Sequence, residues 1–373
     1  MNLLIYGVYD DNNLGDDYMM QKIHKYLKEQ GTNVSFVERN IKKNNYFINE
    51  EIDYLENPII YKKSGKLKKI KKLFSIIKWF ICNDDIEKFD ALIFMGGGYT
   101  NEQFGISNLF KLLLWKYKFK KVNKKIFFTG QTIGPASTKI SSFLLKKLYK
   151  GSTLVNVREK NSLMYIENND IVGNIVGDDA FLDKRREISY KQKENILIVN
   201  YKCFNDYSDE NLFMNAVKEF AQKNNLKVFV IPFRSDNNYE EYKINYNIYQ
   251  ELKQKNIDAS FVVERNIEKL EDIFLKSKYV IGSAYHAIVL GLKYGNSVVS
   301  IYKGNYYKIK MNGILDWYNL NENAIQFCDI DVNLIEKCLK EKYNFETIYS
   351  NTNELIENLN NGWNNIIKII KEK

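Results

Sequence analysis

Short apolar runs alternate with longer amphipathic stretches along most of this chain, and this alternation restricts the fold more than any other feature of the sequence. Runs such as 3–7, 91–95 and 125–130 have the length and the continuous apolar character of strands that are buried on both faces. Because helical segments separate these runs, the pattern predicts parallel sheets with helices on both faces. The sequence therefore predicts an α/β protein.

The predicted strands fall into two series, separated by a polar, lysine-rich stretch at 184–194 that is typical of a surface connection. A length of 373 residues agrees with two domains of about 150 residues each. We therefore predict an N-terminal Rossmann-like domain over 1–187, a C-terminal Rossmann-like domain over 188–330, and helices over 331–373 that pack on the domains. The predicted strands are 3–7, 34–37, 91–95, 125–130, 153–157 and 174–176 in the first series, and 195–200, 227–232, 259–263, 279–281 and 297–301 in the second.

Charge and cysteine content narrow the class of protein. The formal net charge of +9 comes from charges interspersed along the chain, so it attracts phosphorylated small molecules or an anionic membrane as readily as nucleic acid, for which nothing else argues. Four cysteines without a C-x-x-C pair, and only two histidines, offer no structural zinc site, so we expect reduced thiols and no metal. The chain starts with a strand-like run and has no apolar span of ~18 residues, which predicts a cytoplasmic protein.

Three loops at predicted strand ends of the first series carry glycine or polar side chains. The first of them, 9–17, precedes a helix, whose start can receive a sugar hydroxyl, although Asn and Asp also serve there as turn and cap residues. Glycines at 96–98 let a ligand approach the backbone, and an amide side chain after the strand 125–130 offers a donor and an acceptor to a polyol. We predict that this edge binds the hydroxyls of an acceptor through Asn13, Gly15, Asp16, Gly97, Gly98 and Gln131.

Cationic side chains also follow predicted strands. Arg158, between a strand and a helix, can present a planar fork to a carboxylate or phosphate, with an ion pair to Asp178 on the surface as an equal alternative. Arg234 follows the strand 227–232, and Lys303 and Lys308 follow the strand 297–301. They predict a cationic rim for an acidic donor, the alternative being solvated surface charges.

His286 is the better candidate for acid–base chemistry of the two histidines. It lies beside Ser283 at a strand-to-helix junction, where the helix dipole favours neutral imidazole and bound anions. A buried, hydrogen-bonded structural histidine is the alternative. His24 lies among lysines in the first predicted helix, so we expect a solvated residue there.

The order of these motifs resembles the polysaccharide pyruvyl transferase family from residue 3 to about 320. The matching elements are 13–16 (NLGD), 96–98 (GGG), 130–135 (GQTIGP), 157–159 (VRE) with Ser162, 177–181 (GDDAF), and 283–287 (SAYHA) leading to Tyr302 and Lys308. The resemblance implies two Rossmann-like domains of glycosyltransferase type B shape. It also implies transfer of a pyruvyl group from phosphoenolpyruvate to a sugar of a cell-surface polysaccharide or its precursor, which forms a ketal without a cofactor.

The resemblance implies that His286 is the acid or base and that Ser283 and Tyr285 join the cations in binding the donor. One position departs from the family motif Ser-Arg-x-His, because Ala284 stands where the arginine is usual. Another cation then replaces that arginine, or the chain uses a different donor. Two alternatives therefore stay open: a glycosyltransferase of the same fold that uses a nucleotide sugar, and a non-catalytic glycan-binding relative.

Residues 66–81 combine apolar side chains at helical intervals with lysines on the remaining surface. Such a helix can lie in an anionic headgroup layer, which suits a lipid-linked acceptor and a peripheral position at the inner face of the membrane. The alternative is an amphipathic helix packed on the sheet of the first domain.

Overall fold

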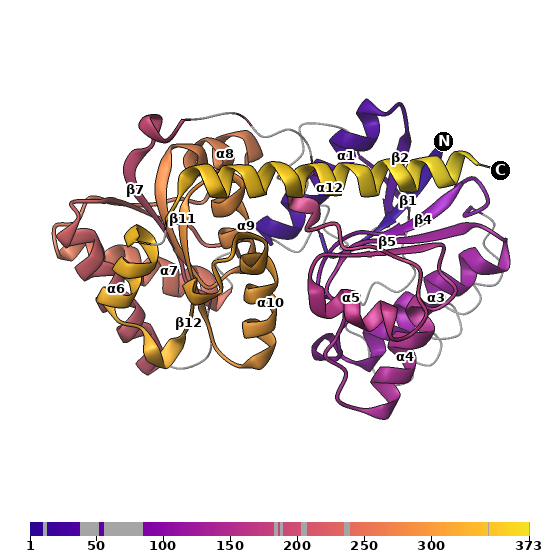
Figure 1. Cartoon of the computed structure of the whole chain (residues 1–373), viewed down its shortest axis with the longest axis horizontal. Helices are drawn as coiled ribbons and strands as arrows, with labels where there is room; N and C mark the ends of the chain where they lie inside the picture. Colours follow the sequence, from indigo (N-terminus) through magenta and orange to yellow (C-terminus); the bar gives the residue numbers. More distant parts are fainter. Residues whose placement is uncertain are drawn as a thin grey trace, which may run out of the picture. The chain divides into compact units, whose positions relative to one another are not determined.

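The computed structural model describes residues 1–9, 13–37, 52–55, 85–182, 186, 189–202, 207–234, 239–341 and 343–372. Within them the chain forms two compact units, which Figure 1 colours along the sequence. The N-terminal unit comprises most of the described residues up to Leu182 together with 358–372, and the C-terminal unit comprises those between 186 and 357 together with 13–18. The sequence placed the boundary after residue 187, but it did not indicate that residues near both ends of the chain change unit.

Six parallel strands form the sheet of the N-terminal unit in the order β3-β2-β1-β4-β5-β6. The order turns back at β1, where Leu3 lies opposite Val34 on one side and Ala91 on the other. This is the strand order of a Rossmann unit, which places ligand-binding loops at the carboxyl ends of the strands. The strands are β1 (Asn2–Tyr6), β2 (Asn33–Val37), β3 (Asp53–Leu55), β4 (Ala91–Phe94), β5 (Lys125–Gln131) and β6 (Leu154–Val157).

Apolar side chains of the strands pack against helices to form the core of this unit. Alternate residues of each strand point to the same face, and on one face they meet Trp115 of α3 and Leu145 of α4. Figure 1 shows α3, α4 and α5 together on that side of the sheet. The helices are α1 (Leu14–Glu29), α3 (Ile106–Lys121), α4 (Lys139–Tyr149) and α5 (Lys160–Glu167).

The C-terminal unit repeats this architecture with the order β12-β11-β10-β7-β8-β9, which turns back between β10 and β7. Its strands are β7 (Glu194–Asn200), β8 (Lys227–Val230), β9 (Ala259–Phe261), β10 (Ser277–Gly282), β11 (Ser297–Tyr302) and β12 (Ala324–Gln326). Its helices are α6 (Tyr207–Lys223), α7 (Glu240–Gln254), α8 (Ile267–Lys276), α9 (Tyr285–Lys293), α10 (Asn305–Leu315) and α11 (Val332–Glu336), and α12 (Phe345–Lys371) follows them. The predicted pair of Rossmann-like folds is confirmed.

The structure differs from the local predictions in three respects. The edge strands β3 and β12 were not predicted, because neither lies in a longer apolar run of the kind that indicated β9, which is equally short. Residues 174–176 form no strand but a single bridge between Ile175 and Val157. His24 was predicted to be solvated, but it is only 8% exposed and its ring lies 6.1 Å from that of Phe36. The prediction failed because lysines that are close in sequence do not show which face of α1 a residue occupies.

The long C-terminal helix α12 contributes to both units. In its first half, Thr352 donates to the carbonyl of Leu292, and in its second half the indole of Trp363 donates to Asp179 Oδ1 at 3.0 Å. The apolar faces predicted after residue 331 therefore pack on both units. Before α11, Asp331 accepts from the backbone of Asn333 and Leu334 and so caps the helix.

Candidate active site

His286 is in the first turn of α9, at the carboxyl edge of the C-terminal sheet. Its side chain is only 7% exposed. Asn200, at the end of β7, holds this turn in place: its side-chain oxygen accepts from Ala284 N at 2.9 Å, and its amide nitrogen donates to Ile231 O at 2.9 Å. Asn200 thereby joins the ends of β7, β8 and β10 beside the start of α9.

Glycine at position 15 is required by the close approach of the first loop to this imidazole. A methyl group added at Gly15 would lie 2.0 Å from Nδ1 of His286 and 2.2 Å from its Cγ, far inside van der Waals contact. Residues 13–18, which include the end of the loop that was predicted to serve the N-terminal domain, therefore belong to the C-terminal unit, where Gly15 lies against His286. Sequence patterns could not show this contact, because the two residues are 271 positions apart.

Residues 13–18 are fastened to the C-terminal unit at both ends of this segment. At its start, Leu14 N donates to Phe233 O at 2.9 Å, and Asn13 forms an antiparallel bridge with Arg234. At its end, the Tyr18 hydroxyl donates to Glu271 Oε1 at 2.6 Å and accepts from Lys293 Nζ at 3.0 Å. Burial, with Tyr294 and Glu271 nearby, raises the pKa of Tyr18, so the hydroxyl keeps its proton for this bond.

The polar residues of the loop also cap α1. The side-chain oxygen of Asn13 accepts from Gly15 N at 3.3 Å, and its amide nitrogen donates to Asp16. Asp16 and Asp17 lie in the first turn, where carboxylates suit the positive end of the helix dipole. The capping interpretation is therefore confirmed, and it coexists with the contact to His286.

The other donor-side candidates lie around the same carboxyl edge of the C-terminal sheet. Arg234 is half-buried over the ring of Tyr239, and Glu241 Oε1 accepts from its backbone at 3.2 Å. Burial raises the pKa of Glu241 despite the charge of nearby Lys202. Ser283 is fully buried, and its hydroxyl accepts from Lys202 N at 2.5 Å.

Aromatic and cationic side chains alternate beyond these residues. The ring of Tyr285 lies 5.2 Å from the imidazole and has Lys310 Nζ 4.7 Å from its centre. Lys303 is half-buried after β11, and Lys308 is exposed on α10. Lys202 donates to the Tyr307 hydroxyl at 2.9 Å and was missed, although it follows a strand just as Arg234 does.

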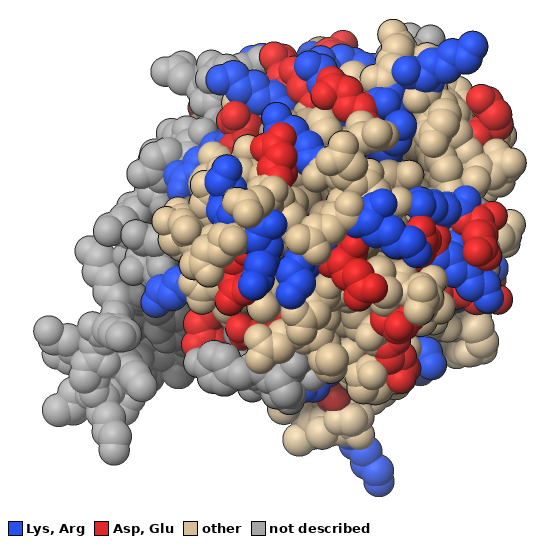
Figure 2. All heavy atoms as spheres, turned by 90° about the vertical axis from the view of Figure 1, so that its left-hand side faces the viewer, with Lys and Arg blue, Asp and Glu red and all other residues tan. Residues whose placement is uncertain are grey.

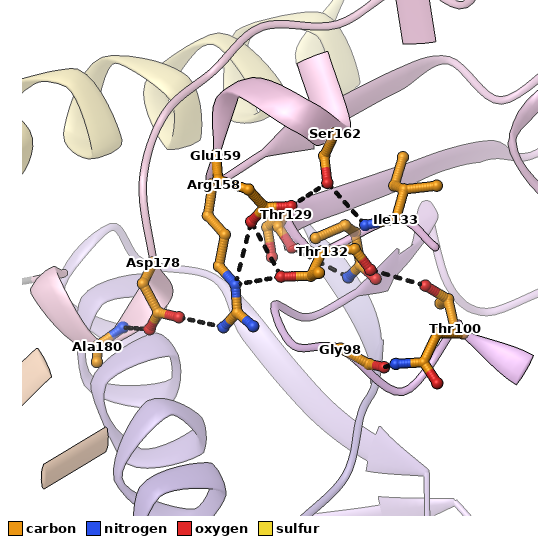
Figure 3. A network of polar contacts seen from close by, with 12 residues as sticks. Gly98, Thr100, Thr129, Thr132, Ile133, Arg158, Glu159, Ser162, Asp178 and Ala180 are labelled. Atoms are coloured by element: carbon orange, nitrogen blue, oxygen red, sulfur yellow. Dashed lines mark hydrogen bonds and ion pairs between the residues drawn. The ribbon is translucent and has the colours of Figure 1, made fainter. Parts of the chain in front are cut away.

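Arg158 takes part in a buried polar network of the N-terminal unit instead (Figure 3). Its guanidinium lies 2.5 Å from Asp178 Oδ2, and its Nε donates to Thr132 Oγ1 at 2.6 Å. The predicted pair with Asp178 is confirmed, but both side chains are almost completely buried rather than on the surface. Thr132 in turn donates to Glu159, whose carboxylate also accepts from Ser162. Burial raises the pKa of Glu159 against the opposing effect of Arg158.

Asp179, next to Asp178, accepts further hydrogen bonds in this buried region. It was not among the predicted site residues. Its Oδ2 accepts from Gly96 N at 2.7 Å and from Thr129 Oγ1 at 2.6 Å, and its Oδ1 accepts from Trp363. Complete burial outweighs these bonds and raises its pKa to about 6. The network therefore fixes the loops after β4, β5 and β6.

The remaining acceptor-side candidates lie in these loops. Gly97 N donates to Gly130 O at 3.1 Å, and the side chain of Asn101 donates to Gly98 O. Gln131 is fully buried, and its amide nitrogen donates to the carbonyls of Phe94, Met95 and Thr129. Its amide donor is therefore committed to the backbone of the neighbouring strand end.

The fold is that of glycosyltransferase type B proteins. MurG of Acinetobacter baumannii matches with a TM-score of 0.56 at 10% identity, covering 100% of this chain and 99% of that one. A UDP-N-acetylglucosamine 2-epimerase of Rickettsia bellii (TM-score 0.60, 9% identity, 99% and 97% covered) and Arabidopsis thaliana UGT89C1 with UDP (0.61, 10%, 99% and 99%) are also similar.

The family model for polysaccharide pyruvyl transferase matches residues 13–305. The chain belongs to the polysaccharide pyruvyl transferase family, which is a family of transferases. No curated protein sequence matches the chain. The match begins at Asn13, two residues before Gly15, the residue that lies against His286.

Proposed function

We propose that this protein transfers a pyruvyl group from phosphoenolpyruvate to a sugar of a cell-surface polysaccharide or its precursor, in the cytoplasm, and forms a ketal. The observation that carries the proposal is the fixed pairing of His286 with the family loop at Gly15, at a strand edge where Arg234, Lys202 and Lys303 supply positive charge. Family membership supports a transferase that acts on carbohydrate. A lipid-linked acceptor fits a precursor of such a polysaccharide.

His286 suits the proton transfers that this reaction needs. The imidazolium protonates the methylene carbon of phosphoenolpyruvate, and a sugar hydroxyl adds to the adjacent carbon while the imidazole takes up its proton. The C–O bond to phosphate then breaks, a second sugar hydroxyl adds to the same carbon and closes the ketal, and the departing phosphate takes up the proton of that hydroxyl. Arg234 and the lysines would hold the carboxylate and phosphate of the donor and stabilise the departing phosphate dianion. Lys202 or Arg234 would supply the positive charge of the family arginine, whose position Ala284 occupies.

The test is phosphate release from phosphoenolpyruvate in the presence and absence of acceptor. We expect acceptor-dependent release by the wild type and a loss of about 100-fold or more in His286→Ala, the usual range for removal of a general acid or base. His24→Gln is the matched control, because His24 is about as buried as His286 but belongs to the N-terminal unit. Equal rates in His286→Ala and wild type would refute the assigned role.

A nucleotide-sugar-dependent glycosyltransferase is the second candidate, and Ala284 is the observation that favours it. Arabidopsis UGT89C1, which shares the fold, was solved with UDP. Thermal unfolding with phosphoenolpyruvate and with UDP-sugars separates the two, because a ligand that binds only the native state raises the melting temperature. Stabilisation by a UDP-sugar alone would favour the second candidate, and a protein that responds to neither donor and releases no phosphate would be a non-catalytic glycan-binding relative.

A further inference from the structure

The outward face of α3 and α4 exposes apolar side chains that the fold does not need there. On α3, Leu109, Leu112 and Trp115 already face the core, yet Phe110 and Tyr117 are 53% and 66% exposed on another face of the helix. They are seven residues apart, so they share one helix face. A core-packing helix needs a single apolar stripe, whereas α3 carries a second one that points into solvent.

The neighbouring helix shows the same excess. Leu144, Leu145 and Leu148 of α4 are buried in the core, whereas Ile140 and Phe143 are 59% and 58% exposed. These two side chains are three residues apart and lie on the outer face of the helix. Large apolar side chains scattered singly need no explanation, but these four lie on two helices that pack against each other, and Tyr117 and Phe143 line the same cavity.

Lysines surround this patch, and neither helix contains an acidic residue. A cavity of ≈ 520 Å³ between the two helices is lined by Tyr117, Phe143 and five lysines, namely Lys116, Lys120, Lys146, Lys147 and Lys150. Glu102, before α3, is held by Ser137 N and Ser141 at the opposite end of α4. By contrast, the face in Figure 2 shows Lys and Arg interspersed with Asp and Glu.

Lys116 of α3 holds the lysine-rich end of α4 against α3. Its ammonium donates to the carbonyls of Lys147, Leu148 and Lys150, at the C-terminal end of α4, and so links α4 to α3. Burial, together with Lys120 and Lys147, lowers the pKa of Lys116 to about 8. The remaining lysines of the cavity repel one another, and anionic groups between them would relieve this repulsion.

We propose that the face formed by Phe110, Tyr117, Ile140 and Phe143 with the cavity lysines is a docking surface for a membrane that contains anionic lipid. Aromatic side chains prefer the interface between headgroups and acyl chains, and lysines bind the anionic headgroups. None of the described helices is long and apolar enough to cross a bilayer, so this contact is peripheral. The inference holds whichever donor the enzyme uses. It rests on other residues than 66–81, which lie outside the described residues.

The experiment is co-sedimentation of the full chain with vesicles of phosphatidylcholine alone and with vesicles that also contain 30% phosphatidylglycerol. The anionic vesicles are tested at two salt concentrations, ~50 and ~300 mM, because salt screens the attraction between exposed charges. We expect binding to the anionic vesicles that weakens with salt. Lys120→Gln with Lys147→Gln should weaken it about 30-fold, since each lysine near an anionic surface contributes about 1 kcal/mol. Tyr117→Ser with Phe143→Ser should weaken it roughly tenfold or more.

Matched controls separate this face from general effects. Met164→Ser with Val172→Ser removes equally exposed apolar side chains of the same unit. Lys253→Gln with Lys255→Gln removes exposed lysines at the C-terminal end of α7. Both controls should bind like the wild type. Absence of binding to either vesicle, or equal binding to both, would overturn the proposal. So would a loss of vesicle binding that only Lys68→Gln with Lys69→Gln causes, because these two lysines belong to the segment 66–81.

Discussion

Gly15→Ala places one methyl group against the imidazole of His286. The added carbon would lie 2.0 Å from Nδ1, and ordinary van der Waals contact begins at 3.4 Å. The imidazole or the loop must therefore move by about 1.4 Å. Because the loop is fastened through Leu14 and Tyr18, and Asn200 holds the turn before His286, neither side can yield freely.

Two consequences of different size follow. Overpacking costs about 1–3 kcal/mol of stability, and replacing glycine within a helix returns up to about 1 kcal/mol, so the net loss should be at most about 3 kcal/mol. A displacement of about 1 Å in a catalytic group can cost about 100-fold in rate. The variant should therefore fold and yet lose about two orders of magnitude in acceptor-dependent phosphate release.

The assay pairs urea unfolding with the phosphate-release rate. Gly31→Ala is the matched control at the other end of α1: it meets no atom within 4 Å, but its φ of +67° makes alanine cost about 1–2 kcal/mol. It should lose similar stability and keep its activity. If Gly15→Ala turns over like the wild type, the contact between the loop and His286 does not position the imidazole.

Three further predictions concern the N-terminal network and the caps. Arg158→Gln removes one partner of a buried ion pair and should lower the free energy of unfolding by about 3–5 kcal/mol, whereas Arg186→Gln, in a pair about half exposed, should cost less than about 1 kcal/mol in the same urea titration. Asp179 has its pKa raised to about 6 in the folded state, so the native protein binds this proton more tightly than the unfolded chain. Its contribution to the free energy of unfolding is complete below about pH 4 and is lost as pH rises through about 6, about 3 kcal/mol in all. Asp179→Asn should flatten that part of the stability–pH curve. An unchanged curve would contradict the raised pKa of Asp179. Asp331→Ala should cost about 1 kcal/mol through the lost cap of α11, measurable by thermal unfolding, and no change would show that the cap is redundant.

The sequence by itself determined the two Rossmann-like folds and the edges at which functional residues gather. Buried parallel strands leave continuous apolar runs, and residues that directly follow such runs must lie at the carboxyl edge of a sheet. This local rule located Arg234, Ser283 and His286, and it also applies to Lys202, which the same reasoning could have found.

Only the tertiary structure decided which of these residues meet. Gly15 lies against His286 across 271 positions, and Trp363 bonds to Asp179 across 184, because chain segments change unit near both ends. Burial followed the same logic: Arg158 and Asp178 were predicted as a surface pair, but the loops after three strands enclose them. Contact and burial at such distances depend on packing between elements, which leaves no periodic signal in the sequence of either element.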